Sequence, residues 1–286
     1  MPVGRRIRRQ LARWLPERVK APFRRRRIGF RPPTIGVPAT FSSDGRGPSV
    51  LIENRVTLHF RDEDREEVTV LLQDNGESVD EMASFLSLAS SARVLFDIGA
   101  AKGLFSEIFC LTDPARRAVA FEPSAALADS AAALIAVNGC ESRINLRRCA
   151  VGAEAGRHTA RLYAWGYVGI DVPEGVDDGG TAVDVEMTSV DREVELLGLE
   201  PDLLKIDVEG YEYEVLVGAK RLLHERKPPI CLELHLDLLE KRGIEPRRVL
   251  AELESHGYRL RSCAGRPLRT ADVLGNLNAV TRLVAY

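Results

Sequence analysis

The sequence predicts a doubly wound α/β fold, in which a mostly parallel sheet is covered by helices on both faces. Two observations lead to this prediction. Beyond Ala92, short apolar strands alternate with amphipathic helical segments, which is the order typical of parallel β-α units. The first of these strands ends in DIGAAKG, Asp97 to Gly103, a glycine-containing turn that leads into a helix. With 286 residues, 45% of them hydrophobic, the chain can bury one sizeable core.

A lead-in is expected before the alternating region. Residues 49–60 predict one or two strands, residues 66–72 another strand, and residues 78–89 a helix with Ser78 as its N-cap. Residues 31–47 are rich in proline, glycine and serine, and predict a linker without regular structure. We therefore divide the chain into a basic arm and linker (1–48), a lead-in (49–91) and an α/β domain (92–286).

The α/β domain is expected to contain five predicted strands and four predicted helices. The strands are expected at residues 93–99, 117–123, 144–151, 202–210 and 229–235, and the helices at residues 104–112, 126–138, 212–226 and 246–257. Residues 156–188 interrupt the alternation between the third and fourth strands. Because long loops in compact domains are often functional, we expect this insertion to face the substrate. Its aromatic residues, His158, Trp165 and Tyr167, either stack on a sugar ring or pack a hairpin.

The first 31 residues form a strongly basic arm. They contain twelve Lys and Arg and the single acid Glu17, so the arm carries +11 and the remainder carries −13 of the total charge of −2. Ile7, Leu11 and Trp14 recur at helical spacing among the arginines. Three interpretations remain open: a solvated tail, contact with an anionic membrane surface, and contact with nucleic acid. The acidic remainder of the chain disfavours nucleic acid.

Cysteine usage and hydropathy predict the compartment. The five cysteines are odd in number and form no CxxC pair, which is typical of reduced packing residues. No apolar run approaches the roughly 18 residues of a membrane span, and the N-terminus lacks the apolar region of a signal peptide. We therefore expect a cytoplasmic protein, whose basic arm would contact the inner face of the membrane if it binds lipid.

The turn from Asp97 to Gly103 predicts a cofactor site. At the carboxyl end of a parallel strand, glycine allows close approach of the backbone to a ligand, and the next helix offers free N–H groups. The spacing is D-x-G-x-x-x-G rather than G-x-G-x-x-G, which argues against a dinucleotide. Glu122 ends the next strand, where a carboxylate can accept hydrogen bonds from both ribose hydroxyls. An adenosine-containing cofactor is favoured over a simple tight turn.

Six motifs in one order strengthen this interpretation. DIGAAKGLFS, AFEPS, CAVGAEAG, TSVD, LLKIDVEGYEYEVLVGA and ICLELH follow the order and approximate spacing of the FkbM family of methyltransferases, which the sequence resembles from about residue 76 to about residue 258. The resemblance implies a class I methyltransferase fold with a seven-stranded sheet whose last strand is antiparallel. It also implies S-adenosylmethionine as the cofactor and O-methylation of a hydroxyl on a sugar, glycolipid or polyketide-like metabolite.

The resemblance assigns the cofactor-binding residues position by position. It assigns the methionine portion to Asp97, Gly99 and Gly103 in the turn after the first strand, and Ala100 of the same turn is a further cofactor-binding candidate. It assigns the ribose to Glu122. Asn138, at the end of the following helix, either lies near the nucleoside or only caps that helix. Ala101 and Lys102 depart from the family's usual residues in this turn, which leaves the contact of Lys102 open.

Charged residues alternate with aliphatic ones along two neighbouring strands. In the strand predicted at residues 202–210, Lys205, Asp207 and Glu209 share one side. The strand predicted at residues 229–235 contains Glu233 and His235. His235 is a candidate general base, since an unperturbed histidine has a pKa near 6.5. The carboxylates and the histidine are also candidate ligands of a divalent cation, to which we do not commit. For Lys205 we favour a structural or electrostatic role, since a buried lysine requires a partner.

Two other functions remain as alternatives. A non-catalytic module could keep the methyltransferase scaffold only for ligand or partner binding. A nucleic-acid methyltransferase could be recruited by the basic arm, although the sequence has no NPPY or Pro-Cys motif of base methyltransferases. The partner that we expect is a small-molecule or glycan acceptor.

Overall fold

The computed structural model describes residues 37–45, 47–53, 55–73, 77–163, 168–170, 180–275 and 280–286. The basic arm, with Trp14, lies outside the described residues, as do Trp165 and Tyr167 of the insertion. Within the described ranges, no helix is long and apolar enough to cross a membrane.

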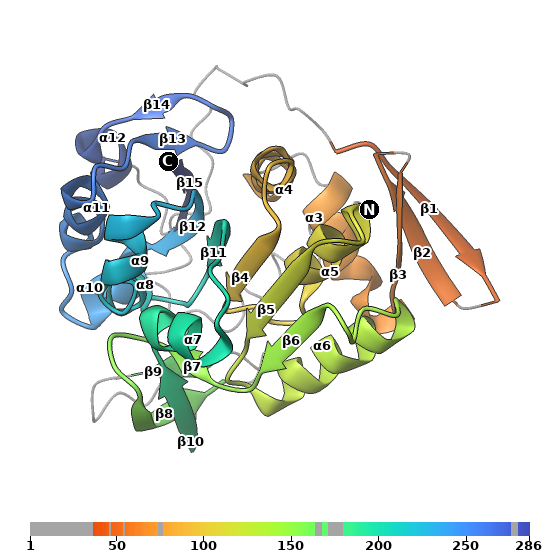
Figure 1. The fold of residues 1–286 in the computed structure, drawn as a ribbon, viewed down its shortest axis with the longest axis horizontal. Helices are drawn as coiled ribbons and strands as arrows, with labels where there is room; N and C mark the ends of the chain where they lie inside the picture. The colour runs from red at the N-terminus through yellow and green to blue at the C-terminus, as the bar shows by residue number, and fades with distance from the viewer. Residues whose placement is uncertain are drawn as a thin grey trace.

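The lead-in is a small antiparallel sheet followed by helices (Figure 1). Its elements are β1 (Ala39–Asp44), β2 (Gly47–Ile52), β3 (Val56–His59), the 3₁₀ helix η1 (Asp62–Asp64), α3 (Arg65–Gln73) and α4 (Glu77–Ala89). Two predictions were wrong here. Residues 31–47 include strand β1, which pairs with β2 in full register, so this stretch is not all linker. Residues 66–72 form a helix, because Val68 and Leu72, four residues apart, are both buried on one helical face.

A mostly parallel sheet forms the centre of the molecule, in the order β14-β13-β15-β12-β11-β4-β5-β6. Its strands are β4 (Val94–Ile98), β5 (Arg117–Phe121), β6 (Ile144–Arg147), β11 (Leu203–Ile206), β12 (Ile230–His235), β13 (Leu260–Ser262), β14 (Pro267–Leu268) and β15 (Val280–Ala285). The last strand runs antiparallel to β12, as expected. The expected count of seven was wrong, because the two-residue strand β14 pairs with β13 at the edge and makes eight in the part of the chain that is described.

Helices cover both faces of this sheet. They are α5 (Leu104–Thr112), α6 (Ala125–Val137), α7 (Val190–Leu197), α8 (Glu212–Val217), α9 (Lys220–Glu225), α10 (Leu236–Lys241), α11 (Pro246–Ser255) and α12 (Thr270–Leu274). Successive strand residues alternate between two apolar cores, since Leu95 belongs to the core that includes residues of α4, α5 and α6, whereas Phe96 belongs to the core that includes residues of α8, α9 and α11. Every predicted helix in this region is present, although residues 212–226 divide into α8 and α9.

The insertion between β6 and β11 contains a second sheet rather than a long loop. Strands β7 (Ala150–Val151), β8 (Gly156–Leu162), β9 (Val168–Ile170) and β10 (Thr181–Thr188) lie in the order β7-β10-β8-β9. Ala160 on β8 and Val185 and Met187 on β10 are buried, which gives the antiparallel strands one apolar face. His158 is half-buried on β8, opposite Val185, as a hairpin residue would be.

The expected N-cap of α4 was wrong, and the structure shows how α7 and α9 are capped. Helix α4 begins at Glu77, so Ser78 lies inside its first turn rather than at the N-cap position. The N-cap of α7 is Ser189, whose side chain accepts a hydrogen bond from the Arg192 N–H. Asp191 instead caps α9, because its carboxylate accepts hydrogen bonds from the N–H groups of Arg221 and Leu222.

The turn after β4 packs directly on the chain that leaves β11. Gly99 has a φ of +79°, and a Cβ atom at this position would lie 1.7 Å from the carbonyl oxygen of Asp207. The Asp207 N–H donates to the Ile98 carbonyl at 2.9 Å. Gly99 is therefore required both by its backbone conformation and by this close approach.

We predict that Gly99→Ala lowers the free energy of unfolding by about 3 kcal/mol or more, because a Cβ at this position collides with backbone that cannot move aside. Gly198→Ala is the matched control. Gly198 also has a positive φ, +59°, but its Cβ would meet nothing within 4 Å. That change is expected to cost about 1 kcal/mol. Urea unfolding of both variants measures the difference, and equal losses would contradict the close-contact argument.

Candidate active site

The N–H groups of the turn after β4 are largely used within the protein. Those of Gly99 and Ala100 both donate to the Phe121 carbonyl, at 3.0 and 2.9 Å, and that of Gly103 donates to the Ala100 carbonyl at 2.7 Å. Gly103 also has a positive φ, and its Cβ position would lie 3.4 Å from Ala131 of α6. The glycines thus shape the turn and its helix contact, while backbone atoms of Gly99 line the adjacent pocket.

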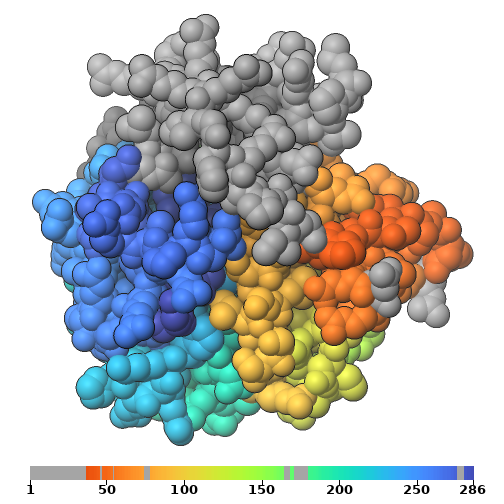
Figure 2. Space-filling view, turned by 90° about the horizontal axis from the view of Figure 1, so that it is seen from above, coloured from red at the N-terminus to blue at the C-terminus, as the bar shows by residue number. Residues whose placement is uncertain are grey.

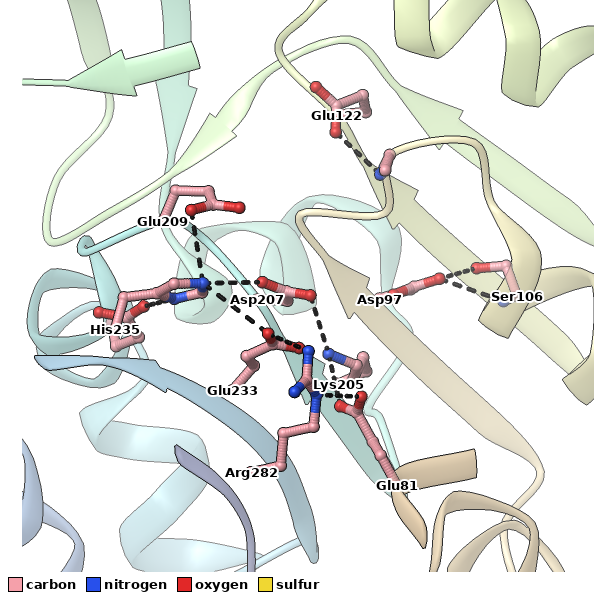
Figure 3. Close-up of polar contacts among 12 residues, drawn as sticks. Glu81, Asp97, Ser106, Glu122, Lys205, Asp207, Glu209, Glu233, His235 and Arg282 are labelled. Atoms are coloured by element: carbon pink, nitrogen blue, oxygen red, sulfur yellow. Dashed lines mark hydrogen bonds and ion pairs between the residues drawn. The ribbon is translucent and has the colours of Figure 1, made fainter. Parts of the chain in front are cut away.

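Glu122 holds this turn from the end of β5. Its Oε2 accepts a hydrogen bond from the Ala101 N–H at 2.9 Å (Figure 3), and its Oε1 accepts one from the Ser124 N–H at 2.7 Å. Burial raises the pKa of Glu122 to about 7, although the two hydrogen bonds oppose the rise. Each carboxylate oxygen keeps further acceptor capacity toward the pocket that Glu122 lines.

Asp97 is fully buried beneath the turn. Its Oδ2 accepts hydrogen bonds from the N–H and the hydroxyl of Ser106, at 3.1 and 2.7 Å, which fix the carboxylate against the first turns of α5 (Figure 3). Burial raises its pKa to about 6, against the opposing effects of Ser106 and Lys205. The Asp97 Oδ1 atom has no hydrogen-bond partner among the described residues. Asp97 does not line the pocket in which the Glu122 side chain lies.

Asn138 lies away from the pocket. Its side-chain amide accepts from the His59 N–H at 2.9 Å and donates to the carbonyls of His59 and Leu134, at 3.0 and 2.9 Å. These contacts tie the end of α6, where Asn138 is the C-cap, to strand β3 of the lead-in. Of the two roles left open for Asn138 by the sequence, the structure supports the cap and not a contact with a nucleoside.

One pocket joins the turn, the acid of β5 and the charged strand end. Its described lining includes Gly99, Glu122, Val151, Ile170, Asp207 and Glu209. The insertion contributes apolar surface through β9, as expected for a segment that faces a ligand. A second pocket, beside β13 and β14, contains none of the predicted site residues. The carboxyl edge of the parallel strands is therefore the candidate active site.

Lys205 is a buried cation in the middle of the sheet. Its Nζ lies 3.0 Å from Glu81 Oε1 and 3.3 Å from Asp207 Oδ2. The ammonium also lies 5.0 Å from the centre of the Phe105 ring. Burial opposes the charged form, but Asp207 and Glu81 outweigh it and raise the pKa of Lys205 well above its usual value. Lys205 is thus an electrostatic partner, as expected.

Glu233 forms a second ion pair beside the first. Its Oε1 lies 2.5 Å from Nη2 of Arg282 on β15, the strand that pairs Arg282 directly opposite Glu233. The Nε of Arg282 lies 3.0 Å from Glu81 Oε2. Burial and the nearby Asp207 charge raise the pKa of Glu233 to about 8, against the effect of Arg282.

His235 lies among carboxylates at the end of β12. Its Nδ1 donates to Glu212 Oε1 at 2.8 Å, because an ionised carboxylate only accepts. Its Nε2 lies 3.4 Å from Glu209 and 3.9 Å from both Asp207 and Glu233. Burial alone would lower the pKa of His235, but the Glu212 hydrogen bond and the surrounding charges raise it to about 10. The raised pKa favours the imidazolium form at neutral pH, which disfavours the expected role of His235 as a general base.

The two pocket-facing carboxylates differ in their proton affinity. Lys205 and His235 outweigh the effect of burial and lower the pKa of Asp207. Burial, with Asp207 as a nearby like charge, raises the pKa of Glu209 despite the attraction of His235. Glu209 also has a φ of +51°, an uncommon conformation for a residue with a side chain. Strained positions of this kind cluster at functional sites.

Three of these residues have the spacing that a cation would need. One ligand atom each from Asp207, Glu233 and His235 lie within 4.8 Å of one another. Lys205 already pairs with Asp207, and Arg282 already pairs with Glu233. The protein's own cations thus already contact two of the three groups.

Sequence reasoning found the five charged residues on β11, β12 and the chain after β11, but missed three of their partners. Glu81, Glu212 and Arg282 come from α4, α8 and β15. Glu81 occupies a buried position of an amphipathic helix, and a charge at such a position was the available signal. Glu212 and Arg282 gave no comparable signal, since their contacts depend on how distant elements pack.

Comparisons with known proteins give one family model and several similar structures. The model of the methyltransferase FkbM domain matches residues 97–260. A search of curated proteins finds no match. Among solved structures, the methyltransferase FkbM from Methylobacillus flagellatus KT is 17% identical with a TM-score of 0.42, and the match covers 68% of this chain and 43% of that one. The chain thus spans less than half of that relative.

Two further structures are similar at lower identity. A putative O-methyltransferase from Klebsiella pneumoniae is 14% identical over 78% of this chain and 85% of that one, with a TM-score of 0.46. The O-methyltransferase from Bacillus cereus in complex with SAH is 13% identical over 77% and 84%, with a TM-score of 0.44. The family model covers more than half of the 286 residues, and the chain belongs to the FkbM methyltransferase family.

Proposed function

We propose that the protein is an S-adenosylmethionine-dependent O-methyltransferase acting on a hydroxyl of a sugar, glycolipid or polyketide-like metabolite. The observation that carries the proposal is the single pocket that joins the Gly99 turn, Glu122, and the carboxylates of Asp207 and Glu209. Glu122, the carboxylate proposed to bind the cofactor, thus faces the same pocket as Asp207 and Glu209, the candidate groups for handling the acceptor's proton. A module that only binds a ligand would not need two carboxylates, Asp207 and Glu209, whose pKa values shift in opposite directions beside the cofactor turn.

The pocket residues fit such a cofactor. Glu122 has the acceptor capacity for ribose hydroxyls, and Leu127, Val151 and Ile170 supply apolar surface for a planar base. When bound, S-adenosylmethionine would supply an activated methyl group on a sulfonium. The anionic Asp207 and Glu209 would stabilise positive charge nearby, because opposite charges attract strongly in a partly buried site.

Glu209 is the proposed general base for the acceptor hydroxyl. Its pKa is raised, its carboxylate is partly exposed to the pocket, and a base with a raised pKa accepts a proton more readily. Asp207 has a lowered pKa and stays ionised, so we assign it the orientation of the hydroxyl through a hydrogen bond. The His235 imidazolium holds both carboxylates at the end of the strands and offsets part of their mutual repulsion.

The basic arm motivates a proposed location. Residues 1–31 carry +11, with Ile7, Leu11 and Trp14 at helical spacing, and such segments bind anionic bilayer surfaces. We propose peripheral contact with the cytoplasmic face of a membrane, where a lipid-linked acceptor would be available. Nucleic acid is the less favoured partner, since the remainder of the chain carries −13.

We predict that Glu122→Ala weakens S-adenosylmethionine binding by about 10- to 100-fold, because a charge-assisted hydrogen bond contributes about 1.5–3 kcal/mol. Isothermal titration calorimetry measures the dissociation constant. Glu186→Ala is the matched control, since Glu186 is exposed on β10 and pairs with the exposed Arg157. Absence of binding to the wild-type protein would overturn the cofactor assignment, and unchanged affinity in Glu122→Ala would remove the role of Glu122.

We predict that Glu209→Gln lowers methyl transfer at least about 100-fold, the usual contribution of a general base, while S-adenosylmethionine binds with similar affinity. Transfer of a labelled methyl group to a glycolipid extract from cells that lack the protein provides the assay. Because protonation inactivates a base, wild-type activity should fall as the pH drops through the raised pKa of Glu209. A Glu209→Gln variant with wild-type turnover and pH profile would contradict this role.

We predict that the full chain binds vesicles that contain anionic phospholipid and releases them as salt rises, because screening weakens attraction between exposed charges. Replacement of the run Arg24 to Arg27 by glutamine should weaken sedimentation with these vesicles. Vesicles of neutral phospholipid are the control. Equal binding to neutral vesicles, or tighter salt-dependent binding to RNA, would count against the membrane proposal.

A further inference from the structure

Glu81 lies between two buried cations, although it belongs to the lead-in. It is on α4, 3% exposed, and outside the segment 97–260 that the family model matches. One carboxylate oxygen contacts Lys205 Nζ at 3.0 Å, and the other contacts Arg282 Nε at 3.0 Å. Helix α4 packs against β12 and β15 and lies between the lead-in strands and the C-terminal segments on the face seen in Figure 2.

Both cations also contact acids of the candidate active site. Lys205 is shared between Glu81 at 3.0 Å and Asp207 at 3.3 Å. Arg282 is shared between Glu81 and Glu233, the latter at 2.5 Å (Figure 3). Glu81 therefore competes with Asp207 for one cation and with Glu233 for the other.

The charges in this group explain why the competition matters. The described carboxylates are Glu81, Asp207, Glu209, Glu212 and Glu233, and the described bases in contact with them are Lys205, Arg282 and His235. Without the Glu81 charge, Lys205 and Arg282 would each lose one carboxylate that competes with Asp207 and Glu233. Both acids would then be held more firmly in their ionised form, since stronger interaction with a nearby cation lowers the proton affinity of a carboxylate.

We propose that Glu81 is a positioning residue for methyl transfer, which holds Lys205 and Arg282 and thereby preserves the proton affinity of the carboxylates at the active-site edge. The inference rests on the proposed function for its catalytic meaning, but the electrostatic effect is independent of any acceptor. It also gives the lead-in a defined role, because α4 supplies a charge that residues 97–260 do not contain.

The titration of Glu233 reports this effect directly. Burial and Asp207 raise its pKa to about 8, within a range that is accessible to solution measurements. The charged groups that face Glu233 are Asp207 from the chain after β11, Lys205 from β11, His235 from β12, Glu81 from α4 and Arg282 from β15. Removal of the Glu81 charge should lower the Glu233 midpoint, because a like charge is lost and Glu81 no longer competes for Arg282.

The experiment is ¹³C NMR titration of glutamate side chains in the full chain, with Glu233→Gln to assign the Glu233 signal. Glu81→Gln keeps the shape of the side chain and removes its charge, and we expect the Glu233 midpoint to fall by about one pH unit or more. Glu66→Gln is the matched control, since Glu66 is exposed on α3 of the same lead-in, and we expect no shift. Glu81→Asp keeps the charge but has a shorter reach, so a smaller fall is expected.

An unchanged Glu233 midpoint in folded Glu81→Gln overturns the proposal, as does an equal fall in the Glu66→Gln control. Should Glu81→Gln fail to fold, Glu81→Asp decides in the same way, and an unchanged midpoint there overturns it. S-adenosylmethionine titration of the same proteins keeps the two proposals distinguishable. Loss of cofactor binding in the wild-type chain would overturn the proposed function and leave the electrostatic result standing.

Discussion

The need to neutralise charges inside a parallel sheet governs the arrangement of this protein. Lys205 lies on the central strand β11, where no water can solvate an ammonium, and its pairing with Glu81 and Asp207 offsets the large cost of burial. On the next strand, Glu233 is neutralised in the same way by its ion pair with Arg282. These partners come from the lead-in and from the last strand, so the active-site edge is complete only when both ends of the described chain pack on the sheet.

A backbone contact joins this charged edge to the cofactor turn. Gly99 and the Asp207 carbonyl approach so closely that no side chain fits between them. Both segments are therefore held at a fixed separation, which is the condition for aligning a donor and an acceptor in a displacement reaction. Glu209, two residues beyond, has a positive φ, and the close packing of Gly210 on Leu238 leaves its turn little room to relax.

Two of the differences between the expected and observed secondary structure share one physical origin. Residues 66–72 alternate well enough for a strand, but the burial of Val68 and Leu72 on a common core selects the helix. Residues 156–188 include a stretch rich in glycine and aspartate, as in a loop, yet strands β8 and β10 pair with each other and bury Ala160 and Val185. In both regions the local pattern was compatible with two structures, and contacts with distant elements chose between them.

The sequence by itself determined the alternation of the five parallel strands with their main helices, because the apolar periodicity and the glycine turn at Gly99 are local properties. It also determined that Asp207, Glu209, Glu233 and His235 lie at one edge, since parallel strands end on the same side. Only the tertiary structure decided what these groups do. The proton on His235 follows from the convergence of carboxylates from three segments, and the state of Lys205 follows from Glu81, more than 100 residues away in the chain. Electrostatic interactions act through space, and no pattern of neighbouring residues records them.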